Sequence, residues 1–416
     1  MTIFAIMKKI LLFLVFCAAM GRLAANDGAF YAAGNQLIPI NETDIRVQKE
    51  ILTIKRVGKQ LEVTVYYEFF NPVGEKDLLV GFEAPSPYNG EYFRNFPEQP
   101  YMHDFKVVMN GKDLPYEIAH VYHLVAAYGA SYYFSDNQEQ KNKNFIIPDY
   151  LQKGKIQSLT PKQCRDTVEN NEGMTCPFHY VYHFKAHFNK GLNIIQHTYK
   201  YELSIRVGDE YWFDYILTAA NRWANHQIDD FTLNINMGDC ESFTIAPTFF
   251  KDNTDWTLTG VGKKNYTTLD GNDQPLSFFH IQKGGISFHQ RNFHPEGELS
   301  IRKPMVVHWF WNQQKYTLPK ATQSMKALQW EYTELYPVAF INYLTAFAKD
   351  TILSKKDKFI LQNFPLAYHG YIFTDKKLRK YFSKTSWYVP DPAYKPDPAT
   401  MTDKEKEWMK YWGQGK

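Results

Sequence analysis

The feature that most constrains this chain is a period-two alternation of apolar and polar side chains. Over residues 61–69, hydrophobic residues recur at every second position, and the run stops at Asn71-Pro72. Successive side chains of a β-strand point to opposite faces of the sheet, so this pattern predicts a strand with one buried face. Helical periodicity is scarce before residue 320. We therefore expect residues 26–319 to form a β-rich part, with room for two subdomains.

Two turns are expected to join strands into hairpins. Asn110-Gly111 separates the alternating segments 105–109 and 114–118, and Asn-Gly is a strong hairpin signal. Lys190-Gly191 separates two longer alternating segments, and a two-residue loop there would place Tyr182 opposite Tyr199. The apolar sets to be paired are Phe178, Tyr180, Tyr182, Phe184, Ala186 and Phe188 on the first segment, and Ile195, His197, Tyr199, Tyr201, Leu203 and Ile205 on the second. A sheet with one buried and one wetter face is typical of an antiparallel sandwich.

The first 25 residues have the pattern of a signal peptide. Lys8-Lys9 precedes the apolar run 10–19, and Leu23-Ala24-Ala25 forms a small-residue cleavage site before Asn26. An apolar run of that length is too short for a membrane span, which needs about 20 residues. Cys17 raises the alternative of lipoprotein processing, although a bulky Phe16 precedes it. We predict an extracytoplasmic protein, periplasmic, cell-surface or secreted, with no transmembrane segment after cleavage.

Cleavage also removes three basic residues and no acidic ones. The mature chain then carries 44 basic and 44 acidic residues, so nothing in its charge favours nucleic acid as a partner. The charge is uneven, because residues 349–384 hold nine Lys and Arg against three Asp. This stretch is either an ordinary solvated surface or a basic patch for acidic envelope polymers or for the acidic N-terminal part.

Three cysteines remain in the mature chain. Cys164 and Cys176 flank a short polar stretch, and export permits a disulfide between them. In the chain-entropy model such a bridge would stabilise the fold by ~3 kcal/mol. Cys240 would then be left over as a buried thiol.

The sequence holds no recognisable motif for catalysis, metal binding or cofactor binding. His179, His183 and His187 recur at intervals of four, but on a strand neighbouring members of this set lie about 13 Å apart, too far for one ion. The chain has no Gly-x-Ser-x-Gly elbow and no complete phosphate-binding loop. We predict no metal site and no cofactor.

The C-terminal quarter changes to helical spacing. Residues 320–350 are predicted to be a helical connector, and residues 351–416 a small helical module. Thr374-Asp375 should cap a helix over 376–384, and the Thr402-to-Glu405 segment has the pattern of a capping box that opens the last helix. The overall fold class is thus α+β.

The module resembles the YARHG domain of exported bacterial proteins. Ala367, His369 and Gly370 match the family motif, and Trp387-Tyr388-x-Pro390 matches its downstream part, while Leu366 and Tyr368 replace the motif Tyr and Arg. The family has no assigned activity. Residues of this motif are the candidate binding residues: Tyr368, His369, Tyr371, Trp387 and Tyr388. We favour the alternative that these residues form a packing core, with Gly370 in a left-handed turn.

The N-terminal part is similar to an uncharacterised family of secreted bacterial proteins. The similarity rests on Ala25-Asn26-Asp27-Gly28, on Glu68-Phe69-Phe70-Asn71, and on the segments 78–85, 215–218 and 228–233 with Trp223. It implies a β-rich exported domain without known chemistry.

The sequence favours a non-catalytic function over an enzymatic one. We expect envelope-associated binding or scaffolding, with an envelope glycan or another envelope protein as the partner. The alternative is a hydrolase of cell-wall or extracellular glycan that uses acids from separate strands, which would require two facing carboxylates in a cleft. Neither the ligand nor the oligomeric state follows from these patterns.

Overall fold

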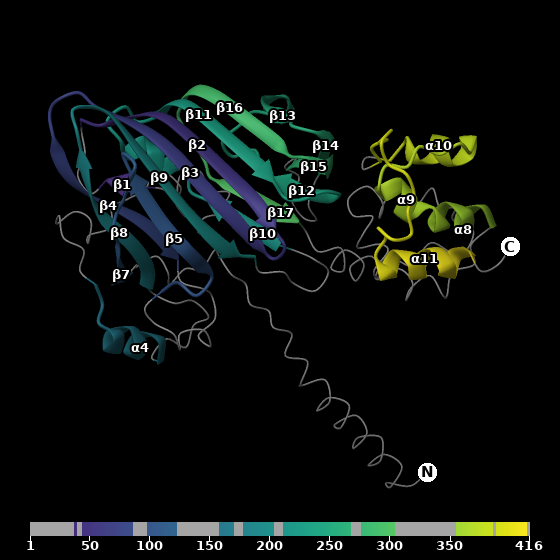
Figure 1. Ribbon diagram of the computed structural model, residues 1–416, viewed down its shortest axis with the longest axis horizontal. Helices are drawn as coiled ribbons and strands as arrows, with labels where there is room; N and C mark the ends of the chain where they lie inside the picture. The colour runs from purple at the N-terminus through teal and green to yellow at the C-terminus, as the bar shows by residue number, and fades with distance from the viewer. Residues whose placement is uncertain are drawn as a thin grey trace, which may run out of the picture.

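The structure is a computed structural model that describes residues 37–39, 44–85, 98–122, 158–169, 178–203, 211–267, 276–303, 355–385 and 388–413. A large β-rich part is followed by a small helical module (Figure 1). The α+β fold class is confirmed. The predicted signal peptide and the predicted helical connector (320–350) lie outside the described residues, and the domain boundaries stay predictions.

The largest sheet of the β-rich part has eight strands, in the order β13-β16-β11-β2-β3-β9-β5-β6. Strands β2 and β11 are parallel, and the other neighbours are antiparallel. Its strands are β2 (Arg46–Val57), β3 (Gln60–Asn71), β5 (Met102–Met109), β6 (Lys112–Asp113), β9 (Gly191–Glu202), β11 (Ile228–Asn236), β13 (Trp256–Leu258) and β16 (Ile286–Phe293).

Two smaller sheets accompany it. The four-stranded sheet, in the order β1-β4-β8-β7, consists of β1 (Leu37–Pro39), β4 (Lys76–Pro85), β7 (Glu117–Tyr122) and β8 (Phe178–Phe188). The five-stranded sheet, in the order β10-β17-β12-β15-β14, consists of β10 (Tyr211–Tyr215), β12 (Glu241–Ile245), β14 (Val261–Thr267), β15 (Leu276–Lys283) and β17 (Leu299–Lys303). Helix α4 (Pro161–Glu169) and the 3-10 turns η4 (Thr218–Arg222) and η5 (Asn253–Asp255) lie in the connections.

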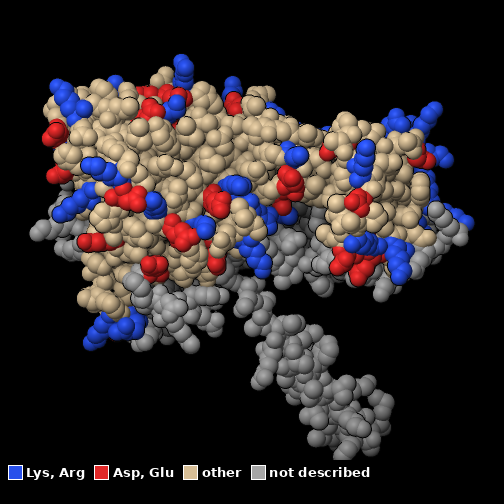
Figure 2. All heavy atoms as spheres, viewed as in Figure 1, with Lys and Arg blue, Asp and Glu red and all other residues tan. Residues whose placement is uncertain are grey.

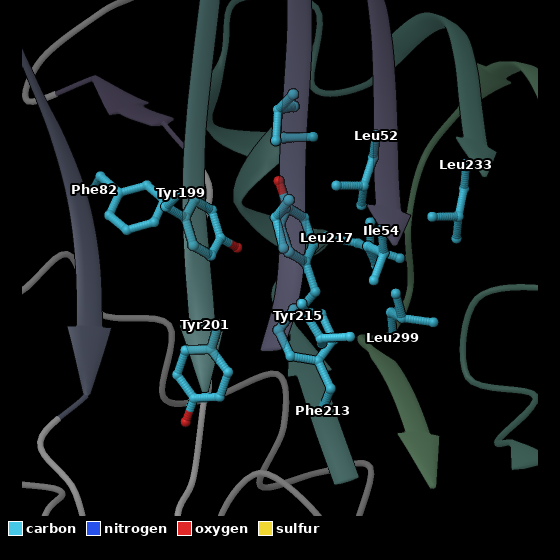
Figure 3. Close-up of a cluster of buried hydrophobic side chains, with 14 of the residues drawn as sticks. Leu52, Ile54, Phe82, Tyr199, Tyr201, Phe213, Tyr215, Leu217, Leu233 and Leu299 are labelled. Carbon is cyan, nitrogen blue, oxygen red and sulfur yellow. The ribbon is translucent and has the colours of Figure 1, made fainter. Parts of the chain in front are cut away.

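Both smaller sheets pack against the buried face of the large one. Phe82 of β4 lies against Tyr199 of β9, with ring centroids 5.4 Å apart. Trp256 of β13 contacts Phe279 of β15 at 5.5 Å. One continuous apolar core therefore runs between the sheets, and Figure 3 shows part of it. Each large side chain buried there contributes roughly 1.5–3 kcal/mol relative to exposure.

The prediction for the hairpin at Lys190-Gly191 is right about which side chains are buried and wrong about which strands pair. Tyr182 and Tyr199 are both buried, as the alternation predicts. However, β8 pairs with β4 and β7, whereas β9 pairs with β3 and β5. The turn therefore connects the two layers of the sandwich, because a tight turn can cross between sheets as readily as it can join neighbours within one.

The Asn110-Gly111 turn is confirmed, but the strand that follows it is shorter than the predicted segment 114–118 and lies earlier in the chain. Both residues have positive φ, 49° and 78°, as a type I′ turn requires. Strand β5 pairs with β6 across this turn over a short stretch. The chain then crosses to the four-stranded sheet, where β7 pairs with β8.

The helical module has its own apolar core. It comprises α8 (Lys355–Gln362), α9 (Phe364–Tyr368), α10 (Lys376–Phe382) and α11 (Asp403–Gly413). The side chains buried together in it include those of Phe364, Phe373, Phe382, Tyr388 and Trp408. As predicted, Asp375 caps α10 by accepting from the backbone N–H groups of Lys377 and Leu378, and Gly370 has a positive φ of 83°.

Candidate functional site

The most unusual polar cluster described lies where the module meets the five-stranded sheet. Cys240 directly precedes β12, and its backbone N–H donates to the carbonyl of Gln282 on β15 at 3.2 Å. Its φ is +53°, in the left-handed region that side chains other than Asn, Asp and His rarely adopt. Cys240 therefore stands in a backbone conformation that is rare for its residue type.

His369 reaches this thiol from the module. It follows the last residue of α9, and its Nδ1 atom lies 3.7 Å from Cys240 Sγ. Its Nε2 atom lies 2.8 Å from Glu405 Oε1. A carboxylate can only accept, so Nε2 is the donor in this contact, and in the tautomer with its proton on Nε2 the lone pair of Nδ1 faces the thiol.

Glu405 is held in place by the helix on which it stands. Its Oε2 atom accepts from the backbone N–H and the hydroxyl of Thr402, at 2.8 and 2.9 Å. Thr402 Oγ1 in turn accepts from the Glu405 backbone N–H at 3.3 Å, which confirms the predicted capping box. Burial raises the pKa of Glu405, but the hydrogen bonds from His369 and Thr402 outweigh burial, so the net pKa is lowered.

Buried polar groups from the sheet surround the thiol. Gln282 donates from Nε2 to Cys240 Sγ at 3.3 Å. His280 of β15 lies with Nδ1 2.7 Å from Ser242 Oγ, and its ring meets that of Tyr368 at 5.5 Å. Burial lowers the pKa of His280 to about 3, so this ring is neutral.

The acidity of the thiol is set by its burial and by its neighbours. Burial raises the pKa of Cys240 to about 12, and the acidic side chains nearby act in the same direction: Asp239, Glu405, Glu241 and Asp391. The sulfur is therefore protonated at rest. Solvent still reaches the site at one side, since 23% of the His369 side chain is exposed.

Further contacts fix the module beside this cluster. The Tyr394 ring stacks on His369, with centroids 5.4 Å apart. Lys263 of β14 donates from Nζ to the carbonyl of Thr385 at 3.2 Å, and burial lowers the pKa of Lys263. The interface between module and sheet is thus a set of specific polar contacts around the aromatic side chain of Tyr368.

The structure separates the candidate binding residues into two groups. Tyr368 is buried and His369 half-buried at the junction with the sheet. Tyr371 packs on Phe373, with ring centroids 5.0 Å apart, and Tyr388 is buried and donates its hydroxyl to the Tyr371 carbonyl at 2.9 Å. Trp387 lies outside the described residues. A binding role for this set stays a prediction.

The cysteines differ from one another in environment. Cys164 is a free thiol on α4, fully buried, and burial raises its pKa to about 11. Cys176 lies outside the described residues, and Cys164 is free, so the predicted bridge between them is not seen in this structure. Cys240, expected as a leftover buried thiol, is a half-buried member of the junction cluster.

The glycan-hydrolase alternative depends on a pair of facing carboxylates. Asp214 of β10 is buried, and burial raises its pKa to about 7, with the charge of Glu298 acting in the same direction. The Glu298 carboxylate, however, accepts from the backbone N–H groups of Leu217 and Thr218, so it is already engaged. In the part of the chain described, no group of three or more His, Cys, Asp and Glu side chains could hold a metal ion.

The sequence points to His369 and gives no sign of its partners. The capping pattern accounts for Glu405 without any second role, and Cys240 and Gln282 carry no local signal. The contacts between sheet and module arise because segments more than 80 residues apart in sequence come together.

Comparison with known proteins identifies the module. Residues 336–414 match the family model described as the YARHG domain, which confirms the resemblance. No curated protein matches the chain. Within the described ranges, no helix is both long and apolar enough to cross a membrane.

Three solved structures show remote likeness. A candidate nutrient-binding protein of Legionella pneumophila is 16% identical, with 93% of this chain and 98% of that one covered and a TM-score of 0.46. The M1 zinc metallopeptidase of Deinococcus radiodurans is 8% identical, with 62% and 42% covered and a TM-score of 0.24. Baculovirus P35 is 11% identical, with 62% and 96% covered and a TM-score of 0.21. At these values the likenesses assign no function.

Proposed function

We propose that the mature protein is an exported, envelope-associated binding or scaffolding protein whose ligand is an anionic envelope polymer, a glycan bearing phosphate or carboxylate groups. The observation that carries this proposal is an exposed basic surface on the YARHG module. Binding there needs attraction between opposite charges and no bond-making chemistry.

The basic surface is formed by α8 and α10. Six lysines on or next to these helices are exposed, and none of them makes an ion pair among the described residues: Lys355, Lys356, Lys376, Lys377, Lys380 and Lys384. The neighbouring acid Asp375 is already engaged as the α10 cap. Figure 2 shows several blue side chains at this end of the molecule, with red ones among them.

The position of the module supports the same function. Helices α8 and α10 extend away from the β-rich part beyond α9 (Figure 1). The junction contacts are made by His369 and Thr385 rather than by these lysines, so the basic surface stays free for a ligand. The signal-peptide pattern and the YARHG match both support export.

Binding of the purified mature protein to isolated envelope material tests the proposal. We expect co-sedimentation that weakens as salt is raised from about 0.05 to about 0.5 M, because salt screens exposed charges. The triple substitution Lys376→Gln, Lys380→Gln and Lys384→Gln should reduce binding about tenfold or more, because three attractive charges are lost.

The matched control is a triple substitution in the β-rich part. Lys55→Gln, Lys59→Gln and Lys112→Gln remove the same charge from exposed lysines and should leave binding normal. Equal losses in both triple variants would contradict the proposal, because binding would then follow net charge rather than this surface.

Export is tested separately by the mass of the processed protein. We expect a mature chain that begins at Asn26. A lipid-modified Cys17 at the N-terminus would instead place the protein on a membrane surface.

A further inference from the structure

We propose that the junction between sheet and module is a thiol-based acyl-transfer centre, with Cys240 as nucleophile, His369 as general base and Glu405 as the residue that positions His369. This activity goes beyond the binding function and uses a different surface. Its substrate class is an activated acyl group carried as an oxygen ester.

The three side chains have the order that such a centre requires. Cys240 Sγ lies 3.7 Å from His369 Nδ1, and His369 Nε2 lies 2.8 Å from Glu405 Oε1. A nucleophile within reach of a base that is itself oriented by a third group is the recurring arrangement of activated cysteine and serine. Longer nucleophile-to-base distances are common before substrate binds.

The hydrogen bond to Glu405 favours the tautomer of His369 that can accept the thiol proton. Glu405 accepts from Nε2, so the lone pair of Nδ1 faces the thiol and can receive its proton. Thr402 holds the other carboxylate oxygen through two hydrogen bonds, which keeps the carboxylate from turning away. The base is therefore already oriented before any substrate arrives.

The backbone at Cys240 is consistent with a fixed nucleophile. Five described residues other than Gly have positive φ, and the other four are Asp, Asn or His: Asp104, Asn110, His226 and Asn292. Asn and Asp tolerate this conformation, and His is enriched in it as well, whereas Cys is not. Residues held in sparsely populated backbone regions gather at functional sites.

Gln282 supplies a hydrogen-bond donor at the same place. The residue is 5% exposed, and its Nε2 atom lies 3.3 Å from the sulfur. When the sulfur adds to a carbonyl carbon, the carbonyl oxygen becomes negative beside this sulfur. A buried amide N–H so placed stabilises that charge.

The protonated state of the thiol decides how the reaction starts. A thiolate is not present at rest, because burial and four neighbouring acids raise the pKa and keep the proton on sulfur. Proton transfer to His369 must therefore accompany attack on the acyl carbon. Such a thiol reacts slowly with simple alkylating agents and needs its base, unlike a preformed thiolate.

The reaction conserves atoms and protons in two halves. The sulfur–carbon bond forms while the thiol proton passes to His369 Nδ1. The carbon–oxygen bond to the leaving group then breaks, and the proton on Nδ1 passes to the departing oxygen. Water or an amine attacks the resulting thioester and gives its proton to Nδ1, after which the sulfur leaves and recovers that proton.

The centre exists only when the module is docked on the sheet. Cys240 and Gln282 come from the β-rich part, and His369 and Glu405 come from the module. Apolar packing alone could hold the module on the sheet. The polar contacts at the junction are explained if the two parts together form a reactive centre.

The test uses the full mature chain and p-nitrophenyl acetate as the acyl donor. We expect acetylation of Cys240, located by peptide mass mapping, and release of p-nitrophenolate. His369→Ala should lower the acetylation rate about 100-fold, whereas Cys240→Ser should abolish thioester formation at that peptide. The matched control His187→Ala removes a histidine that pairs with Asp77 in the four-stranded sheet and should leave the rate unchanged.

A positioning role for Glu405 predicts a second change. Glu405→Gln should lower the acetylation rate about tenfold and shift its pH profile, because an amide cannot hold the imidazole proton as a carboxylate does. The shift in the pH profile separates this role from a structural one, which would lower the rate without moving the profile.

If the junction is only structural, His369→Ala should have the opposite effect on the reactivity of Cys240. Loss of His369 would then expose the thiol, and both acetylation and iodoacetamide labelling of Cys240 would become faster. That outcome overturns the proposal, as does a wild-type protein in which Cys240 takes no acetyl group. Envelope binding through the lysines of α8 and α10 would be unaffected by either result.

Discussion

The carboxylate of Glu405 lies 2.8 Å from His369 Nε2, and the same side chain caps the helix on which it stands. One oxygen therefore serves the junction with the sheet, and the other serves the start of α11. Folding of this helix and docking of the module are coupled through a single residue.

This coupling predicts different costs for two substitutions. Thr402→Ala removes the side-chain cap and one hydrogen bond to the Glu405 carboxylate but keeps the contact with His369, so it should lower the free energy of unfolding by ~1 kcal/mol. Glu405→Ala removes the cap and also leaves His369 without its partner, so we expect a loss larger by ~1–3 kcal/mol. Urea unfolding of the mature chain measures both.

The pKa of Glu405 gives that comparison a pH dependence. A carboxyl whose pKa is lowered in the folded state stabilises the fold above its unfolded pKa, and this contribution is lost as the pH falls through the folded value. The difference between wild type and Glu405→Ala should therefore shrink in acid. A difference that stays constant between neutral pH and strong acid would argue against the contact.

His197 predicts a second acid effect, within the sandwich core. The ring is fully buried on β9, neither nitrogen has a hydrogen-bond partner among the described residues, and burial lowers its pKa to about 3. At a pH between the unfolded pKa of about 6.5 and the folded pKa, His197 is protonated in the unfolded chain and neutral in the folded chain. Stability should therefore fall as the pH drops through this window, by an amount on the order of several kcal/mol.

His197→Phe should remove this contribution. The ring already lies among Tyr67, Phe82 and Tyr199, at centroid distances of 5.8, 5.4 and 6.3 Å, so an apolar ring fits the site. We expect higher stability at neutral pH, by ~1–3 kcal/mol, because no polar nitrogen remains buried without a partner. We also expect a flatter stability profile across the acid window. The control His289→Phe replaces an exposed histidine paired with Asp230 and should leave that slope intact.

The buried faces of the strands follow from the sequence, and their partners do not. Alternation is local, so it assigns Phe184 and Tyr199 to the core correctly. The pairing of strands depends on which sheet the chain enters after a turn. At Lys190-Gly191 the chain passes from one layer of the sandwich to the other. The parallel pairing of β2 with β11 likewise joins segments about 180 residues apart, which no local pattern encodes.

The same limit applies to the candidate site. The motif indicates His369 and Gly370, because both belong to a short continuous run of residues that matches the family pattern. Tyr368, which replaces the motif Arg, is buried against His280 of the sheet, so its role depends on a surface the motif does not contain. Cys240 stands out in the sequence as the odd cysteine, but only the fold brings it to His369.

The face assignment on β8 makes a direct prediction. Phe184 is 2% exposed, and the neighbouring Lys185 is exposed. Phe184→Ala should destabilise the β-rich part by ~3 kcal/mol or more, because it leaves a cavity in the core. Lys185→Ala should change the free energy of unfolding little. Denaturant unfolding of both variants checks this, and similar effects would mean that β8 presents its other face to the core.

Gly370 allows the packing role of the YARHG motif to be tested. Its φ is +83°, and a Cβ atom placed there would lie 2.7 Å from the carbonyl oxygen of Val389. Gly370→Val therefore meets both backbone strain and a clash with a backbone atom, which cannot move without displacing the segment that follows. A module of this size is only marginally stable, so we expect the substitution to unfold it. The β-rich part, which has a separate core, should melt as in the wild type.

Two glycine variants serve as controls for Gly370→Val. Gly58 has φ +63°, and no atom lies within 4 Å of the point that a Cβ would occupy, so Gly58→Val carries the strain without the clash. Gly74 has neither feature, and Gly74→Val should be nearly silent. Limited proteolysis and thermal melting should show loss of the module in Gly370→Val alone. A module that stays folded in this variant would show that the turn at Gly370 can rearrange, and the motif glycine would then need an explanation in ligand binding.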